Sequence, residues 1–140
     1  MNDLVNYIQK EIYITYNKKY SKKYIKDKLV PIISYICSSK SNKFLFGGSQ
    51  GIGKSSLINI ITKTIEKFYN KNILVLSLDN YYLSKKERLF LSKKIHELLI
   101  TRGVPGTHNI KNLLENINQF IENKYPINIP LFDKLIDDIS

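Results

Sequence analysis

Several residue types and patterns are scarce in this chain of 140 residues, and each scarcity excludes a class of protein. Cys37 is its only cysteine, so neither an intramolecular disulfide nor a cysteine-based zinc site can form, and a reducing compartment is expected. No apolar run approaches about 18 residues, the minimum for a membrane-spanning helix. The first seven residues lack the basic patch and apolar run of a secretory leader. We therefore expect a cytoplasmic protein without a membrane partner.

Arginine is also scarce, although the chain is strongly basic. The formal charge is +10, yet Arg88 and Arg102 are the only arginines. Such a charge attracts polyanions, but arginine is the preferred donor for bidentate recognition of bases and phosphates. Alanine is absent, whereas Lys, Asn, Ile and Tyr, which have A/T-rich codons, supply 66 of 140 residues. Base composition thus explains much of the lysine excess. A basic nucleic-acid-binding domain is the least favoured function, and no nucleic-acid partner is expected.

The N-terminal third has the apolar spacing of helices. With 43% apolar and 24% charged residues, the chain has the composition of one soluble globular domain. Residues 3–20 carry apolar side chains at helical spacing, Ser21 could cap a second helical segment, and Pro31 could begin a new turn. We expect residues 1–42 to form an N-terminal helical segment.

From residue 43 the hydrophobic period changes. Residues 44–46 form a short β-prone run that stops at two glycines, and residues 54–69 return to helical spacing. Residues 73–78 are apolar enough for a strand buried on both faces of a parallel sheet. Residues 43–140 therefore have the pattern of an α/β domain.

Capping signals predict two further helices. A capping-box pattern at Ser84 predicts a helix to about Ile100, and Asn109 can cap another helix that ends near Asn123. Residues 125–130 are bracketed by prolines, which suits an edge or the base of a lid better than a central strand.

A phosphate-binding loop lies between the first strand and its helix. Residues 48–55 match G-x-x-x-x-G-K-[ST] in full, in the strand and helix context that this motif requires. Glycines let backbone N–H groups turn toward one anion, Lys54 should reach the β/γ-phosphates of ATP, and Ser55 can bind Mg²⁺. The alternative is a glycine turn followed by a surface lysine. The expected ATP-binding residues are Gly48, Ser49, Gln50, Gly51, Ile52, Gly53, Lys54, Ser55 and Ser56.

A carboxylate follows the second predicted strand. Asp79 comes at the carboxyl end of residues 73–78, the edge where ligands bind in open α/β sheets. It could accept the proton of a substrate hydroxyl that attacks the γ-phosphate. The alternative is a cap for the turn that follows.

Longer blocks of sequence resemble one kinase family. The blocks are residues 77–83, Arg88, the string T-R-G-V-P-G-T-H-N at residues 101–109, and F-D-K at residues 132–134 followed by the aspartates at 137–138. In this order they resemble D-glycerate 3-kinase and its relatives in the phosphoribulokinase/uridine kinase group. The eight residues T-R-G-V-P-G-T-H make the most specific match.

The resemblance implies an ATP- and Mg²⁺-dependent kinase acting on a small organic acid, glycerate first. It assigns Lys54 to phosphate transfer and Asp79 to the catalytic base. The residues that it implies for the acceptor site are Tyr82, Arg102, His108 and Lys134. Arginine binds carboxylates bidentately, and Arg102 is favoured over Arg88 for this purpose. Arg88 could instead form an ion pair with Glu87 or neighbouring residues, and His108 could merely lock its loop.

Departures from the family pattern set the limits of this expectation. Asn80 and Asn109 stand where the family has aspartates. After the aspartates at 137–138 the family would continue with an arginine and a further strand, whereas this sequence reads Ile139 and Ser140. The expected fold is thus a nucleoside-kinase-like P-loop α/β fold with an incomplete parallel sheet and N-terminal helices, in which residues 43–140 form the N-terminal part of the kinase domain. The strand expected between residues 44–46 and 73–78 is missing, so both would face a gap. An alternative function follows: a truncated or split, non-catalytic remnant that binds ATP weakly or needs a partner chain for the missing half.

Overall fold

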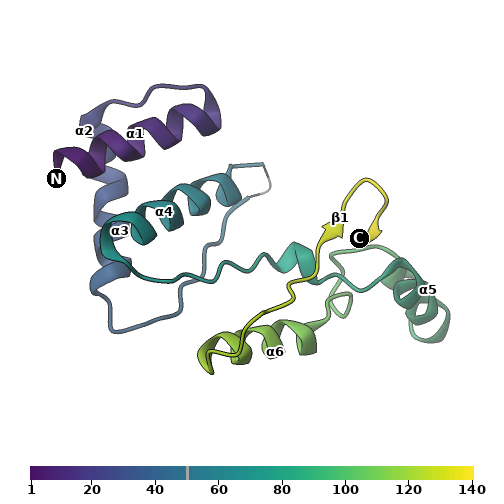
Figure 1. The fold of residues 1–140 in the computed structure, drawn as a ribbon. Coiled ribbons are helices and arrows are strands. Elements are labelled where there is room, and N and C mark those ends of the chain that lie inside the picture. The colour runs from purple at the N-terminus through teal and green to yellow at the C-terminus, as the bar shows by residue number, and fades with distance from the viewer. Residues whose placement is uncertain (50) are drawn as a thin grey trace. The chain divides into compact units, whose positions relative to one another are not determined.

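The chain forms two compact units. The computed structural model describes residues 1–49 and 51–140, and contacts divide them into unit 1, residues 1–73, and unit 2, residues 74–140. Helices dominate both (Figure 1). Unit 1 contains α1 (Asn2–Tyr16), α2 (Lys22–Tyr24), the π-helical η1 (Ile25–Leu29), α3 (Val30–Ser38) and α4 (Lys54–Tyr69). Unit 2 contains the 3-10 helix η2 (Leu78–Tyr81), α5 (Lys85–Lys94), the 3-10 helix η3 (Glu97–Ile100), α6 (Ile110–Ile121), β1 (Phe132–Asp133) and β2 (Asp138–Ile139). Within the described ranges, no helix has the length and apolarity that crossing a bilayer demands.

Unit 1 is built on one aliphatic core. Helix α1 packs on α4, and α3 and η1 close the same cluster. The buried side chains are Leu4, Val5, Ile8, Ile12, Ile25, Leu29, Ile33, Ile60, Ile61 and Ile65. Their spacing of three to four residues within α1 and α4 places them on one face of each helix, as the sequence predicts. The helical segment expected over residues 1–42 and the helix after the phosphate loop therefore share one core.

A π-helical turn joins α2 to α3. The Ser21 hydroxyl accepts a hydrogen bond from the Tyr24 N–H at 3.1 Å, so the predicted cap is confirmed. The N–H of Val30 donates to the carbonyl of Ile25, five residues back. Pro31 follows at the start of α3 and has no N–H to donate, so the wider turn before it leaves the helix continuous.

The predicted parallel sheet is wrong for the residues that the structure describes. Residues 43–49 and 70–77 form neither strand nor helix, and the sheet that the described residues do form is the antiparallel β1–β2 pair. Leu45 is 98% exposed and Val75 is 44% exposed, although both runs are apolar enough for a core. A strand is held by backbone hydrogen bonds to its neighbour, and the described residues contain no counterpart of the expected intervening strand.

In unit 2, helix α5 begins as predicted but ends early. Ser84 and Glu87 form both hydrogen bonds of the capping box. The helix stops at Lys94, six residues before the predicted end, and η3 follows. The Nδ1 atom of His96 accepts from the Leu98 N–H at 3.2 Å, which offers the backbone an alternative to continuing the helix.

The rest of unit 2 is α6, an extended segment and a hairpin. Asn109 caps α6 through the Asn112 N–H at 3.1 Å, as predicted, and the helix ends at Ile121. Residues 126–130 run without strand pairing, and the carbonyl of Asn128 accepts from the buried Asn116 side chain of α6 at 3.1 Å. The chain then turns through β1 and β2, with Phe132 opposite Ile139.

Candidate functional site

The backbone of the phosphate loop adopts conformations that favour glycine. Gly51 has φ 79° and Gly53 has φ 89°, both in the left-handed region. Gly53 directly precedes α4, and the hydroxyl of Tyr16 in α1 donates to its carbonyl at 3.3 Å. Gln50 lies outside the described residues. The predicted glycine-rich entry to a helix is therefore formed in unit 1, with an N-terminal tyrosine beside it that the sequence pattern did not indicate.

Lys54 folds back onto this loop. Its Nζ atom donates to the carbonyls of Gly48 and Ser49, at 2.8 Å each. The first turn of α4 carries no acidic side chain, and its leading N–H groups have no partner within the helix. The helix dipole and the ammonium charge therefore combine at this end of α4, where they could bind phosphate oxygens. The role of Lys54 in binding phosphate stays a prediction, with a surface lysine after a glycine turn as its alternative.

The remaining phosphate-loop residues lie around the same helix end. Ile52 is 68% exposed, and Ser55 and Ser56 stand in the first turn of α4. Over the described ranges there is no group of three or more His, Cys, Asp or Glu that could enclose a metal ion. Mg²⁺ prefers oxygen ligands and keeps several waters, so a hydroxyl such as that of Ser55 together with phosphate oxygens suits it without such a group.

In unit 2, Asp79 contacts two of the residues predicted for the acceptor site. The Lys134 ammonium donates to Oδ2 of Asp79 at 2.7 Å, and the Tyr82 hydroxyl donates to Oδ1 at 3.4 Å. The hydrogen bond from Lys134 lowers the pKa of Asp79 and outweighs the effect of partial burial. Asp79 is therefore a carboxylate at neutral pH, and half of its side chain is exposed. Among the described residues its hydrogen-bond partners are the side chains of Lys134 and Tyr82, and because Tyr82 belongs to the turn that follows, the capping alternative stays beside the catalytic one.

Tyr82 and His108 are brought together by a β-bridge. The bridge pairs these two residues in antiparallel fashion, and their rings lie 4.4 Å apart between centroids. Backbone hydrogen bonds flank the bridge, from Leu83 to Thr107 at 2.9 Å and from Asn109 to Tyr81 at 2.6 Å. Burial, followed by the nearby Asp79 charge, raises the pKa of Tyr82. Tyr82 thus stays a hydroxyl donor at neutral pH, on a loop that His108 helps to fix.

The two arginines converge on one carboxylate. Arg102 donates through Nη1 to Oδ1 of Asp137, and Arg88 donates through Nη2 to Oδ2 of the same group at 2.9 Å. Arg88 is fully buried, whereas about a third of the Arg102 side chain is exposed. The partner of Arg88 is Asp137 and not Glu87, whose carboxylate serves the capping box. Arg102 therefore remains the arginine that a soluble carboxylate could reach.

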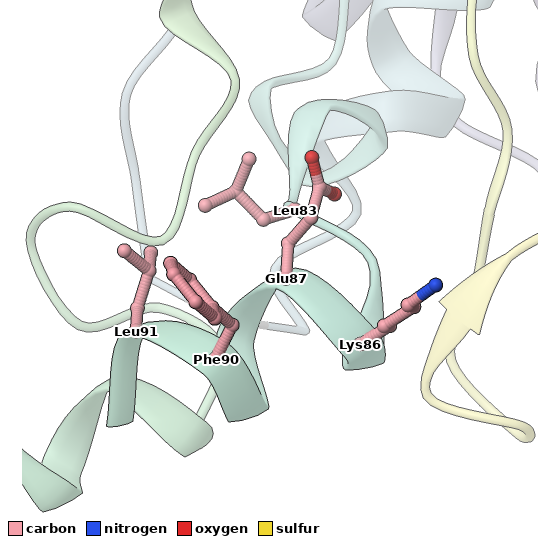
Figure 2. A pocket seen from close by; sticks show the side chains of 5 residues that line it. All are labelled: Leu83, Lys86, Glu87, Phe90 and Leu91. Carbon is pink, nitrogen blue, oxygen red and sulfur yellow. The ribbon is translucent and has the colours of Figure 1, made fainter. Parts of the chain in front are cut away.

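The structure also contains a hollow that these residues do not line. An open hollow of ≈ 560 Å³ lies beside α5 and is lined by the five side chains drawn in Figure 2, namely Leu83, Lys86, Glu87, Phe90 and Leu91. None of the predicted ATP- or acceptor-binding residues lines it. A catalytic pocket needs convergent polar groups, and the Glu87 carboxylate is already bound to Ser84. We therefore assign the candidate chemistry not to this hollow but to the acceptor cluster, which consists of Asp79, Tyr82, Arg102, His108, Lys134 and Asp137.

Sequence reasoning missed one residue of the cluster. Asp137 appeared only within a family block, and the structure makes it the shared partner of Arg88 and Arg102. It has φ 58°, a left-handed conformation in which aspartate is enriched. The sequence signal was the pair of adjacent aspartates at 137 and 138, which does not reveal which one faces an arginine.

Comparison with known proteins gives matches to P-loop proteins. The KAP family P-loop domain matches residues 23–103, more than half of the chain. A budding-yeast protein of Saccharomyces cerevisiae named "Probable ATP-dependent kinase TDA10" is 39% identical over 98 residues, 64% of this chain and 34% of its own length. A Schizosaccharomyces pombe protein named "Uncharacterized kinase mug58" is 30% identical over 115 residues, 79% of this chain and 41% of its own length.

Two further findings limit how much of the relatives' function can be assigned to this chain. The chain spans between a third and about two-fifths of the length of the curated relatives that it matches. No solved structure gives a significant match. The matches thus show that the chain contains a P-loop region and that it is similar to parts of two proteins named as kinases.

Proposed function

Because the chain belongs to the KAP family of P-loop domains, we propose that it binds ATP and transfers the γ-phosphate to a hydroxyl of a small organic acid, D-glycerate first. The observation that carries the proposal is the contact between Lys134 and Asp79, which are 55 residues apart. Two sequence blocks that resemble parts of a kinase acceptor site meet in this contact. The names of the two fungal relatives support the kinase class and leave the acceptor open.

Asp79 is the base of the proposed reaction. Its carboxylate accepts the proton of the acceptor hydroxyl as that oxygen bonds to the γ-phosphorus, and the bond from that phosphorus to the bridging oxygen of ADP breaks. The lowered pKa keeps Asp79 ionised and makes it a weak base. A weak base is adequate because phosphoryl transfer depends mainly on positioning and on stabilising negative charge. Lys134 supplies positive charge beside it.

The phosphate loop holds the nucleotide in this proposal. Lys54 exchanges the carbonyls of Gly48 and Ser49 for oxygens of the β- and γ-phosphates, and the N–H groups at the start of α4 bind the same anion. Ser55 would contribute its hydroxyl to a bound Mg²⁺. When bound, the metal ion would neutralise charge on the phosphate oxygens.

Arg102 binds the acceptor carboxylate in this proposal. Its guanidinium is partly exposed and carries more donors than its pair with Asp137 uses. Guanidinium and carboxylate groups match in a bidentate geometry that a hydroxyl cannot reproduce. An acid such as glycerate is therefore favoured over an uncharged polyol of the same size.

A second candidate is an ATP-binding region that lacks catalysis by itself. It is motivated by the apolar runs at residues 44–46 and 73–78, which form no sheet and leave Leu45 and Val75 exposed. In this alternative a further strand, from a partner chain or another polypeptide segment, completes the sheet before phosphoryl transfer occurs. Glycerate phosphorylation then requires that partner.

The test compares the chain with Lys54→Ala and Lys71→Ala variants. ATP affinity is measured by calorimetry, and ADP release is followed with D-glycerate and with glycerol. Lys71 is the matched control, because its ammonium also donates to a carbonyl of unit 1, that of Cys37 at 2.7 Å, but far along the chain from the loop. Loss of the Lys54 charge should weaken ATP binding about tenfold or more, as expected for a charged hydrogen bond.

The outcomes separate the two candidates. ADP release that requires D-glycerate and Lys54 supports the kinase. Lys54-dependent ATP binding without ADP release supports the binding region that needs a partner. Both candidate functions would be contradicted if ATP affinity were equal in the Lys54→Ala variant, the Lys71→Ala variant and the unaltered chain.

A further inference from the structure

The acceptor cluster depends on a very short hairpin. Strands β1 and β2 contain two residues each, and Lys134 lies in the turn between them. Within the turn, the Leu135 N–H donates to the Asp133 side chain at 2.7 Å. An isolated two-stranded hairpin is marginally stable at best, even when its strands are longer than these. The position of Lys134 therefore requires contacts from outside the hairpin.

Arg88 supplies a fixed anchor for that hairpin. Its guanidinium is fully buried and donates to the carbonyls of Leu83 at 3.1 Å and Ile100 at 2.8 Å. Its Nη2 atom donates to Asp137 twice, to the backbone oxygen at 2.6 Å and to Oδ2 at 2.9 Å. A buried guanidinium with this many partners is held in one orientation, so it fixes Asp137 in turn.

Because Arg88 fixes Asp137, Asp137 can in turn hold the acceptor residues in position. Its other carboxylate oxygen accepts from Arg102, and the same Nη1 atom of Arg102 lies 3.5 Å from the carbonyl of Lys134. The Lys134 ammonium then reaches Asp79 at 2.7 Å. One carboxylate therefore joins the buried anchor to the residues expected to bind the acceptor.

We propose that Asp137 is a positioning residue of the acceptor site: held by Arg88, it orients Arg102 and keeps the hairpin where Lys134 contacts Asp79. The acceptor role rests on the proposed kinase function, whereas the positioning of Lys134 does not. The competing explanation is that Asp137 only neutralises two arginines. In that case its removal lowers stability but leaves the Lys134–Asp79 contact in the folded molecules.

The test uses Asp137→Asn, with Asp138→Asn as the matched control in the same hairpin. Asp138 accepts from the N–H groups of Lys85 and Ile139, both at 2.9 Å, and its carboxylate contacts neither arginine. Asparagine tolerates the left-handed conformation at position 137 and keeps an oxygen for Arg88. Carbon-13 NMR titration of the Asp79 carboxyl in the full chain reports its contact with Lys134.

The pKa of Asp79 in each variant decides whether Asp137 positions Lys134. The groups around Asp79 are Lys134, Tyr82 and His108, and the hydrogen bond from Lys134 is the largest influence on its pKa. In Asp137→Asn the pKa of Asp79 should rise toward the ordinary value of 3.8, while Asp138→Asn should leave it lowered. A folded Asp137→Asn protein with an unchanged Asp79 titration would overturn the proposal.

Activity supplies a second, separable measurement. If the chain is an active kinase, kcat should fall by up to about a hundredfold in Asp137→Asn, with ATP affinity unchanged. If the chain proves inactive, the proposed function fails while the titration still tests the positioning role. Circular dichroism checks folding. Should Asp137→Asn unfold, Asp137→Gly is the second variant. Glycine accommodates φ 58° and leaves the backbone carbonyl at position 137 free to accept from Arg88, so the Asp79 titration is repeated with that protein.

Discussion

The two units bury different kinds of side chain. Among the described residues, unit 1 encloses ten buried aliphatic residues in one cluster, while its buried polar residues are Glu11 and Thr64. The buried hydrophobic residues of unit 2 are Tyr81, Leu99 and Phe132, and its buried polar residues are Arg88, Thr107 and Asn116. Unit 1 is therefore stabilised mainly by apolar burial, and unit 2 mainly by satisfied polar contacts.

This difference matches the chemistry expected of each unit. The phosphate loop of unit 1 binds through backbone groups and a helix end, which an aliphatic core holds firmly without entering the site. The acceptor cluster of unit 2 needs charged side chains at set positions, and a charged network orients them. The network has a cost, because removing one member leaves hydrogen-bonding groups of the others without a partner.

Replacing the central arginine should have the largest effect. Arg88→Met keeps much of the side-chain volume, but it removes the donor from the carbonyls of Leu83 and Ile100 and from two oxygens of Asp137, the backbone oxygen and Oδ2. Each buried acceptor left without a donor costs about 1–3 kcal/mol, so the loss of these contacts together should cost about 3–5 kcal/mol. Hydrogen exchange measured by mass spectrometry should show lost protection across unit 2 and little change in unit 1.

Arg102→Met is the control for that experiment. Arg102 pairs with the same aspartate but is partly exposed, so water can replace its contacts. Its loss should cost under about 1 kcal/mol. Equal destabilisation by both substitutions would show that burial of Arg88 is not what stabilises unit 2.

A cavity in the aliphatic core should give the opposite pattern. Ile8 is fully buried between α1 and its neighbours, and Ile8→Ala should cost about 3 kcal/mol through lost burial and the cavity left behind. Protection from hydrogen exchange should fall in unit 1 and persist in unit 2. Ile14→Ala, in the same helix at a side chain that is 62% exposed, is the matched control and should cost much less. If unit 2 loses protection equally in Ile8→Ala, the two units do not unfold separately.

Local signals in the sequence predicted the helices well and the sheet poorly. The helix expected over residues 54–69 has those bounds in the structure, and the caps at Ser21, Ser84 and Asn109 are formed. Each of these features depends on residues within a few positions of one another. A parallel sheet depends on partners far apart in the chain, and residues 44–46 and 73–78 have no partner strand in the described residues, whatever their β propensity.

The same contrast applies to the candidate site. The glycine loop and Lys54 followed from a local motif with a physical reason for each residue type. The grouping of Asp79 with Lys134 followed only from the family resemblance, because no spacing rule connects residues so far apart. The pair of Arg88 with Asp137, which are 49 residues apart, was not predicted for this reason. Glu87 was the nearer acid, but the capping box already uses it.

Acid should have the smallest effect and should act on unit 2. Burial alone would raise the pKa of Asp137, but the hydrogen bonds from Arg88 and Arg102 outweigh it and lower the pKa, and Lys134 lowers that of Asp79. A carboxyl with a lowered pKa in the folded state adds stability above its unfolded value, here 3.8, and loses it as the pH falls through the folded value. Protection of unit 2 amides should therefore decline between about pH 5 and about pH 3, beyond the intrinsic pH dependence of exchange.

The Asp137→Asn variant isolates the part of this decline that the arginine pair causes. Asparagine does not titrate, so the variant should be less stable than the unaltered chain at about pH 5, and this difference should shrink toward about pH 3. The substitution leaves every side chain of unit 1 unchanged, the aliphatic cluster and the buried Glu11 included, so unit 1 provides the internal reference. A stability difference that stays constant across these pH values would mean that Asp137 stabilises unit 2 through its shape and backbone contact with Arg88. In that event the charge of Asp137 would not be part of what stabilises unit 2, and the contrast with the aliphatic core of unit 1 would not rest on this ion pair.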